Sequence, residues 1–304
     1  MKTHKSIRKG FTLIELLTAV TITTVIIGVL IGATRMSMDA WKDSRDKARA
    51  SRLAKESIEL LARDLEGIVI RSGNEYEWLS VKMDTNLQGG ELGPSTHAEM
   101  KNPLEFIFLT AATDRYDGKI GDDDFDKGGD VSAVIYKMVY KDQFEGTSGG
   151  TAFPVFSLYR QRIDPDRTFK EFLAQPNIQE LASKEDVTNP NNFIAENVYN
   201  LTVTLIFEYT NTGTGVIEQK RLPIMASGSD YKEVRIKGDK VEISGGAPLP
   251  DDARLSGVEL GILVLSDSGM RALNKKSFKD KSAFAKFVKE NSHYFTKSVV
   301  LPRP

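Results

Sequence analysis

The chain has 304 residues and a formal net charge of −1 at pH 7, from 41 basic and 42 acidic side chains. This balance gives no sign of the clustered basic patch that is typical of nucleic-acid binding. The sequence contains no cysteine, which excludes structural disulfides, thiolate metal sites and thiol nucleophiles. An exported domain above roughly 150 residues buries enough surface to fold without disulfides, so export is not excluded.

A basic leader and a long apolar run open the chain. The leader ends at Gly10 and carries four positive side chains, Lys2, Lys5, Arg8 and Lys9. Residues 11–33 contain one charged side chain, Glu15, and are long enough to cross a bilayer core of about 30 Å as a helix. A carboxylate in such a span costs roughly 2.5–3.5 kcal/mol on insertion scales, which predicts a partner for Glu15. Because basic flanks stay in the cytoplasm, we expect residues after 34 outside the inner membrane.

The residues around this boundary resemble the class III signal of type IV pilins and type II secretion pseudopilins. The pattern is a basic residue, Gly, and then Phe-Thr-Leu-x-Glu, and it is met by Lys9, Gly10, Phe11, Thr12, Leu13 and Glu15. The resemblance implies that a prepilin peptidase cuts between Gly10 and Phe11 and that the new N-terminus of Phe11 is methylated. An ordinary signal anchor that contains a glutamate is the alternative interpretation.

The same resemblance implies a role in assembly for the start of the apolar run. Glu15 is expected to pair with the N-terminus of a neighbouring subunit. Helix–helix packing is expected to come from the apolar side chains around it, Leu13, Ile14, Leu16, Leu17, Val20 and Ile22.

A single helix is predicted over residues 12–66, because residues 11–66 contain no proline. At about 1.5 Å per residue it would be roughly 80 Å long. Residues 34–66 form its amphipathic half, with an apolar stripe at helical spacing through Leu53, Ile58, Leu61, Leu65 and Ile68. Gly67 is the expected stop. Gly28 and Gly32 form a small-xxx-small pair, which indicates either close helix contact or the ordinary glycine content of membrane helices.

Residues 67–304 are predicted to form an α+β head with a mainly antiparallel sheet. Period-two and β-branched patterns predict strands over 78–83, 104–110, 131–140, 156–162, 198–209, 232–236, 240–243 and 258–265. Helices are expected near 177–184 and 270–292. Long polar loops are expected over 84–103, 114–130, 145–154 and 185–192. The domain organisation is therefore a leader (1–10), a transmembrane half-helix (11–33), an amphipathic half-helix (34–66) and the head.

The most acidic stretch offers a candidate metal site. Asp122, Asp124 and Asp126 alternate as in a calcium loop, which needs hard oxygen ligands in a tight turn. The EF-hand template fails, since Lys127 stands where glycine belongs and Ala133 where the bidentate glutamate belongs. Calcium occurs in related pseudopilins at sites that are not EF-hands. The alternative is a solvated acidic loop without metal.

The sequence offers no catalytic signature in a supporting context. No GxxxxGK[ST], HExxH or GxGxxG motif occurs, and the GxSxG match at Gly146–Gly150 lies in an expected polar loop, without the strand-turn-helix context of a nucleophile elbow. His4, His97 and His293 stand outside any motif. The C-terminal helix region is aromatic, through Phe278, Phe284, Phe287, Val288, Tyr294 and Phe295. These side chains are expected to belong to the core, with an exposed partner surface as the alternative.

Beyond the N-terminus the chain resembles the J-class minor pseudopilins. In that class a leucine-rich helical stripe ends in an Arg-Asp-Leu element that leads into a strand, and Arg63, Asp64 and Leu65 match it. The acidic loop and the helix over 270–292 depart from the class, so a minor type IV pilin stays open. Glu15 argues against the K-class tip subunit, which lacks that acid.

The resemblance implies a non-enzymatic subunit at the tip or in the priming complex of a periplasmic filament. A head as large as residues 67–304 would crowd a repeating lattice. The expected partners are the prepilin peptidase, other pseudopilins or pilins, and an inner-membrane assembly platform, without nucleic acid or a cofactor other than the calcium considered above. The rival hypotheses are a minor pilin whose head binds an extracellular ligand, a surface or DNA, and a membrane-anchored enzyme.

Overall fold

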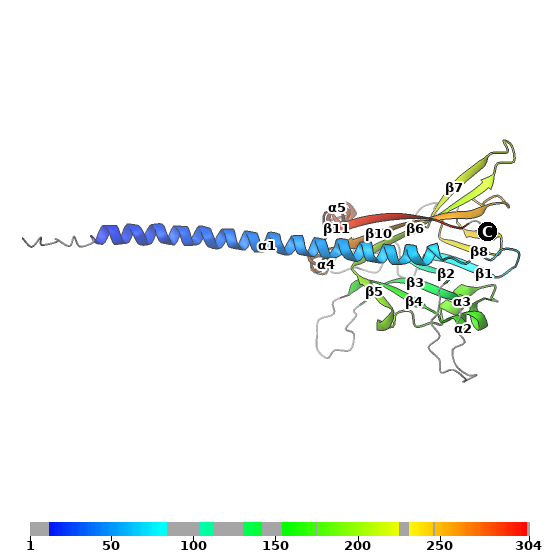
Figure 1. The fold of residues 1–304 in the computed structure, drawn as a ribbon. Helices are drawn as coiled ribbons and strands as arrows, with labels where there is room; N and C mark the ends of the chain where they lie inside the picture. Colours follow the sequence, from blue (N-terminus) through cyan, green and yellow to red (C-terminus); the bar gives the residue numbers. More distant parts are fainter. Residues whose placement is uncertain are drawn as a thin grey trace, which may run out of the picture. The chain divides into compact units, whose positions relative to one another are not determined.

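The computed structural model describes residues 12–83, 104–111, 130–141, 154–173, 175–224, 231–245 and 247–302. The chain divides into two compact units, residues 1–46 and 47–304. One helix, α1 Leu13–Glu66, is 54 residues long and contributes to both units. The prediction of a single helix over 12–66 is therefore confirmed (Figure 1).

Two antiparallel sheets and the end of α1 build the second unit, which we call the β-rich unit (residues 47–304). The larger sheet has the spatial order β5 Phe193–Glu196, β4 Val155–Arg162, β3 Val131–Lys141, β2 Leu104–Ala111, β1 Glu77–Met83, β8 Glu233–Lys237 and β9 Lys240–Ser244. The smaller sheet has the order β11 Ser292–Val300, β10 Arg254–Leu265, β6 Val198–Thr210 and β7 Ile217–Ile224. The predicted α+β class with antiparallel strands is confirmed.

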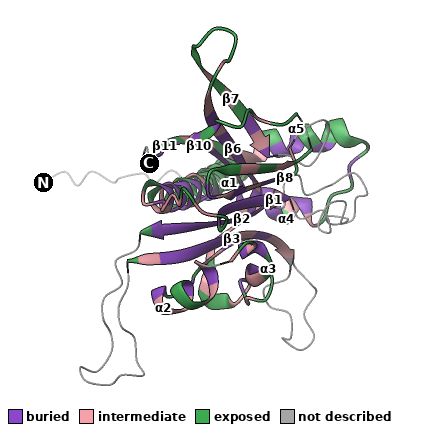
Figure 2. Cartoon of the chain, turned by 90° about the vertical axis from the view of Figure 1, so that its right-hand side faces the viewer, coloured by how far each residue is buried: buried purple, intermediate pink, exposed green. Residues whose placement is uncertain are grey.

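Short helical segments complete the β-rich unit. They are α2 Pro165–Arg167, the π-helix η2 Thr168–Phe172, α3 Ile178–Ala182, the 3₁₀ turn η3 Pro190–Asn192, α4 Asp267–Leu273 and α5 Lys281–Asn291. Figure 2 shows α2 and α3 on the side of the larger sheet that faces away from α1. The smaller sheet lies on the opposite side of α1, so within this unit the helix runs between the two sheets.

The apolar stripe of α1 makes the helix part of one continuous core. Ile58, Leu61 and Leu65 are at most 4% exposed, and Ala54 and Ala62 are fully buried beside them. Each large aliphatic side chain buried in this way contributes roughly 1.5–3 kcal/mol. The opposite side of the helix carries charged residues such as Arg52, Lys55, Glu56 and Arg63, which are exposed. The sequence predicted a one-sided pattern for residues 34–66, and the structure shows it only in the later part of this range, because residues 34–45 are exposed throughout.

Asp64 fixes the end of α1 to the larger sheet. Its carboxylate accepts two hydrogen bonds from the Arg160 guanidinium, at 2.7 and 2.9 Å, and one from the Tyr136 hydroxyl at 2.5 Å. Burial first, and then the Asp64 carboxylate, raises the pKa of Tyr136, so the hydroxyl stays a donor at any physiological pH. The helix then stops at Gly67, where an added Cβ would lie 3.0 Å from Thr110 Oγ1.

Two further ion pairs tie separate elements of the unit together. Lys297 on β11 donates to Glu59 on α1 at 2.5 Å, and this bond holds the pKa of the Glu59 carboxyl below its usual value. The stabilisation from this pair is therefore present at neutral pH and is lost as the pH falls through that lowered pKa. Arg235 donates two 2.8 Å hydrogen bonds to Glu77, whose side chain is completely buried.

The eight predicted strands all occur, with ends displaced by four residues at most. The short helix expected near 177–184 is α3. The predicted helix over 270–292 is wrong as a single element, because the chain forms α4, a connector over 274–280, and α5 instead. The break follows from a helix cap: the Asp280 carboxylate accepts a 2.7 Å hydrogen bond from the Ala283 amide and starts a new helix there.

The aromatic residues of this region are divided between core and surface. Phe278, Phe284, Phe287 and Val288 are buried, as expected. Tyr294 is 58% exposed and Phe295 is partly buried, because both lie on the unpredicted strand β11, where side chains alternate between the two faces.

We predict that Asp64→Asn lowers the free energy of unfolding by about 2–3 kcal/mol, because it leaves the partly buried Arg160 guanidinium without its counter-charge. Denaturant unfolding of the full chain in detergent would measure this loss. Glu66→Gln is the matched control, since Glu66 lies two residues further along α1 and is exposed. Equal stability of the two variants would contradict the anchoring role of Asp64.

Candidate functional site

The first turn of α1 closes on itself through Thr12 and Glu15. The Thr12 amide and hydroxyl both donate to Oε2 of Glu15, at 3.0 and 2.8 Å, and the Glu15 amide donates to the Thr12 hydroxyl at 3.4 Å. This reciprocal arrangement is a capping box, which satisfies backbone donors that a helix start leaves unpaired. Within this chain, Glu15 therefore has a local partner at the start of the helix.

The apolar side chains around Glu15 are uncovered. Leu13, Ile14, Leu16 and Leu17 are 82%, 73%, 61% and 64% exposed. The exposure continues along the helix through Val20, Ile22, Val25, Ile26, Ile27, Val29, Leu30 and Ile31. Soluble proteins rarely leave a contiguous apolar surface of this size in water. This face therefore requires lipid or the helices of other chains.

Polar groups inside the apolar stretch are satisfied by the helix itself. Thr21, Thr23, Thr24 and Thr34 each donate a 2.8 Å hydrogen bond to the carbonyl four residues earlier, and Thr18 donates likewise to Ile14. Hydroxyls bonded in this way present no unpaired donor to hydrocarbon. Among the described residues, α1 is the one helix that is long and apolar enough to cross a membrane.

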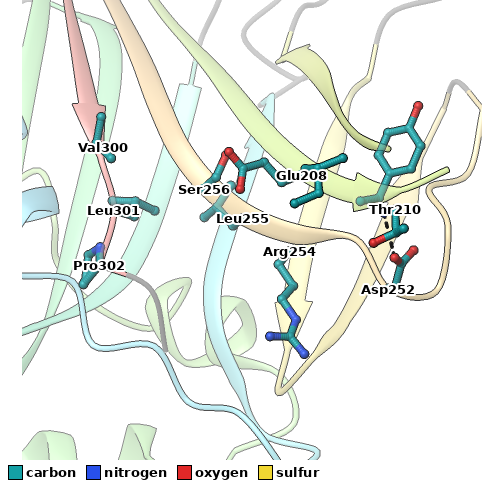
Figure 3. A pocket seen from close by; sticks show the side chains of 11 residues that line it. Glu208, Thr210, Asp252, Arg254, Leu255, Ser256, Val300, Leu301 and Pro302 are labelled. Carbon is teal, nitrogen blue, oxygen red and sulfur yellow. Dashed lines mark hydrogen bonds between the residues drawn. The ribbon is translucent and has the colours of Figure 1, made fainter. Parts of the chain in front are cut away.

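The β-rich unit contains a pocket of about 530 Å³ beside the ends of four strands. Its lining includes an acidic pair, one arginine and an apolar rim: Glu208, Tyr209, Thr210, Ile217, Asp252, Arg254, Leu255, Ser256, Val300, Leu301 and Pro302. Figure 3 shows Asp252 beside Thr210 at one end of the pocket and Val300, Leu301 and Pro302 at the other. Ile217 and Val300 are 68% and 84% exposed.

The polar groups of this pocket are mostly engaged in holding the strands. Asp252 accepts from the Thr210 amide at 2.8 Å, Glu208 accepts from the Gln219 side chain at 3.0 Å, and Ser256 donates to the Ile206 carbonyl at 3.1 Å. Arg254 makes no ion pair with any described residue. The described lining therefore supplies a free cation and apolar surface, and it contains no histidine or paired acid and base suited to proton transfer.

Several predicted site residues lie outside the described residues. These are Gly10 and Phe11 of the expected cleavage site, the three candidate calcium ligands Asp122, Asp124 and Asp126, and the histidines His4 and His97. Cleavage, methylation and calcium binding therefore stay predictions. Within the described part of the chain, no three His, Asp or Glu side chains converge as a metal site.

A comparison with protein families matches residues 5–31 to the prokaryotic N-terminal methylation motif. The chain carries a prepilin-type N-terminus. The motif supports a type IV pilin-like or pseudopilin protein, and it implies processing by a prepilin peptidase and assembly with other pilins. Together with the apolar part of α1, it supports membrane anchoring. The match covers less than a tenth of the 304 residues, so it does not distinguish the members of this group.

No curated protein and no solved structure matches the chain significantly.

The capping role of Glu15 is the main feature that the sequence interpretation missed. The signal was present, because Thr12-Leu13-Ile14-Glu15 fits the S/T-x-x-E pattern of a capping box. From the sequence, the Glu15 carboxylate was expected to find its partner only in another subunit. The two roles involve the same carboxylate, so a neighbouring N-terminus would have to compete with the hydrogen bonds from Thr12.

We predict that Thr12→Ala weakens the first turn of α1 by about 1 kcal/mol, because it removes the hydroxyl half of the capping box. Hydrogen exchange of the amides of residues 13–16 in a nanodisc would show about fivefold faster opening. Thr12→Ser should preserve protection. Thr24→Ala removes a hydroxyl that only bonds within the helix, and an equal acceleration in that control would contradict the prediction.

Proposed function

We propose that the protein is a minor pseudopilin, a structural subunit of a type II secretion pseudopilus with a tip or priming role. The observation that carries this proposal is the combination of the methylation motif with Glu15 in the first turn of α1, whose apolar part up to residue 33 is exposed throughout. A free-standing signal anchor has no need for an acid at that depth. A subunit that packs against parallel copies of the same motif has a use for it.

Assembly follows from the chemistry of the processed N-terminus. The precursor inserts with its basic leader in the cytoplasm and its β-rich unit in the periplasm. Cleavage between Gly10 and Phe11 creates an α-amino group one turn before Glu15. Such a group on a neighbouring subunit is a charged donor, and charged donors form stronger hydrogen bonds than the neutral Thr12 groups do. Exchange of the Thr12 cap for this contact joins one subunit to the next within the membrane.

The size of the β-rich unit supports a minor rather than a repeating subunit. Two sheets and eleven strands follow or flank the end of α1 in the described residues. A unit of this bulk favours a rare position, at a tip or in a priming complex. The Arg63-Asp64-Leu65 element supports the J-class in particular, because Asp64 bonds the helix end to the larger sheet and Leu65 is buried in the core.

The buried polar groups of the β-rich unit are consistent with a structural role, as is the membrane-capable helix. The two most buried carboxylates of the β-rich unit, Glu77 and Glu105, lie beside Arg235 and beside Lys82 and Lys137, respectively. Asp64 is held by Arg160 and Tyr136. Each of these pairings joins separate strands or joins α1 to a strand. These three acids therefore join elements of the fold, and we propose no catalytic step.

A minor type IV pilin is the second candidate, and the pocket in Figure 3 favours it. A cavity of about 530 Å³ with a free arginine and an apolar rim has the size and mixed lining of a small-ligand or peptide site. Deletion of the gene in its host separates the two candidates. Loss of protein secretion with normal surface attachment supports the pseudopilin, and the reverse supports a pilin that binds an extracellular ligand.

Gly10→Ala is expected to block maturation, because a side chain at the residue before the cleaved bond obstructs a peptidase that requires glycine there. Co-expression with a prepilin peptidase, followed by gel mobility, would show the uncleaved precursor. Ser6→Ala, within the same leader, should be processed normally. Efficient processing of the Gly10 variant would remove the class III assignment and leave an ordinary signal anchor.

Glu15→Gln is expected to be cleaved but to lose most co-purification with partner subunits. Glutamine also completes a capping box, so the variant removes the charge and retains the helix cap. Affinity capture from detergent-solubilised membranes would measure the loss, with Glu66→Gln as the matched control on an exposed position of the same helix. Undiminished capture would contradict the pairing role of Glu15.

A further inference from the structure

A cluster of lysines covers one surface of the β-rich unit. We call it the lysine face, and it consists of Lys275, Lys276, Lys279, Lys281, Lys286 and Lys289, all of which are exposed. Residues 267–291 contain seven basic and three acidic side chains, a balance of +4. The rest of the chain after residue 10 has 30 basic and 39 acidic side chains, a balance of −9. The lysine face therefore differs in sign from the rest of the protein.

The underside of this segment is a packed aromatic cluster. Phe278 contacts Phe284 and Phe287 with ring centroids 5.1 Å apart in both cases, and Phe284 contacts Tyr199 on β6 at 6.0 Å. The three phenylalanines are at most 7% exposed. Figure 2 shows α5 with its buried residues on one side and its exposed residues on the other. The lysines are thus held on a fixed platform and do not belong to a loose tail.

Among the described residues, half of the lysines of the lysine face have no ion-pair partner. Lys286 lies 3.9 Å from Glu290, but no described residue forms an ion pair with Lys275, Lys279 or Lys289. The nearby acids have other partners. Asp280 caps α5 through the Ala283 amide, and Asp267 accepts hydrogen bonds from Arg49 and Asn197.

We propose that the lysine face binds the anionic phospholipid headgroups of the membrane in which the chain is anchored. Charge complementarity defines the ligand as a phosphate-bearing surface. The phosphate groups are those of lipids, because the same chain carries a membrane-capable helix. A surface tethered by such a helix meets the bilayer at high effective concentration. In sequence, Arg49, which bonds to the first residue of α4, follows the apolar run that ends at residue 33 by only 16 residues.

The outer side of α5 indicates contact at the level of the headgroups without insertion. Between its lysines lie Ser282, Ala283 and Ala285, which are exposed and small. Membrane-inserting helices carry large apolar or aromatic side chains on the lipid side, whereas here the aromatic side chains face the core. Binding should therefore depend on charge and should be screened by salt. The inference goes beyond the proposed function and requires only the membrane anchor.

The experiment uses the absence of cysteine in the full chain. A Ser282→Cys reporter on α5, carrying an environment-sensitive fluorophore, is reconstituted as the full-length protein in nanodiscs of phosphatidylcholine, with or without phosphatidylglycerol. Lipids with a quencher on the headgroup report proximity. We expect quenching in the anionic bilayer, little in the neutral one, and loss of quenching at high salt.

The charge variant is Lys279→Gln/Lys286→Gln/Lys289→Gln. It should reduce the docking equilibrium constant about a hundredfold, since each lysine near an anionic surface contributes about fivefold. The matched control is Lys170→Gln/Lys184→Gln/Lys240→Gln, which also removes three exposed lysines and also contains one that pairs along a helical turn, Lys184 with Glu180. The control should dock like the unmodified chain.

Three results would overturn the proposal. The first is equal quenching in neutral and anionic bilayers, and the second is an equal loss in the two triple variants. The third is unchanged quenching in the α5 variant together with loss of co-purification with partner subunits, which would assign the lysine face to an acidic protein. Because cleavage and Glu15-dependent capture are measured separately, a failure here is distinguishable from a failure of the proposed function.

Discussion

The helix α1 has to be stable in two different environments, and the rest of the structure depends on this constraint. Its apolar part, from Leu13 to residue 33, exposes every large side chain, while the part within the β-rich unit buries an apolar stripe that includes Leu61 and Leu65. The first part is stable only in lipid or among other helices. The second part is stable only between its two sheets. The chain therefore combines an exposed apolar helix that is long enough to cross a membrane with a folded unit.

The junction between helix and sheets determines how firmly the β-rich unit is held to α1. Asp64 joins the helix end to β3 and β4, and Lys297 joins β11 to Glu59 on the same helix. These contacts join the helix to both sheets. At the other end of the helix, the described partners of Glu15 are neutral groups of Thr12. The chain is thus firmly bonded where it must stay folded and weakly bonded where we propose that it exchanges partners.

Much of this architecture was predictable because it depends on local pattern. The proline-free run predicted α1, and period-two and β-branched patterns predicted β6 and β10. β7 was not predicted, and its Pro223 is tolerated because β7 is an edge strand. β11 was missed because its aromatic residues were assigned to the preceding helix. The partners of Asp64 and Glu77 lie 72 to 158 residues away, and no local pattern identifies such contacts.

The candidate site was also predictable in part, where a local sequence pattern marks it. The motif around Gly10 and Phe11 was found from the sequence and matches the methylation motif. The capping box between Thr12 and Glu15 was not predicted, although it lies in the same segment. The most direct test of the account is the intact mass and N-terminal sequence of the unmodified chain after co-expression with a prepilin peptidase. The account predicts a chain that begins at Phe11 and carries one added methyl group on its α-amino nitrogen. A chain that still begins within residues 1–10 would contradict it.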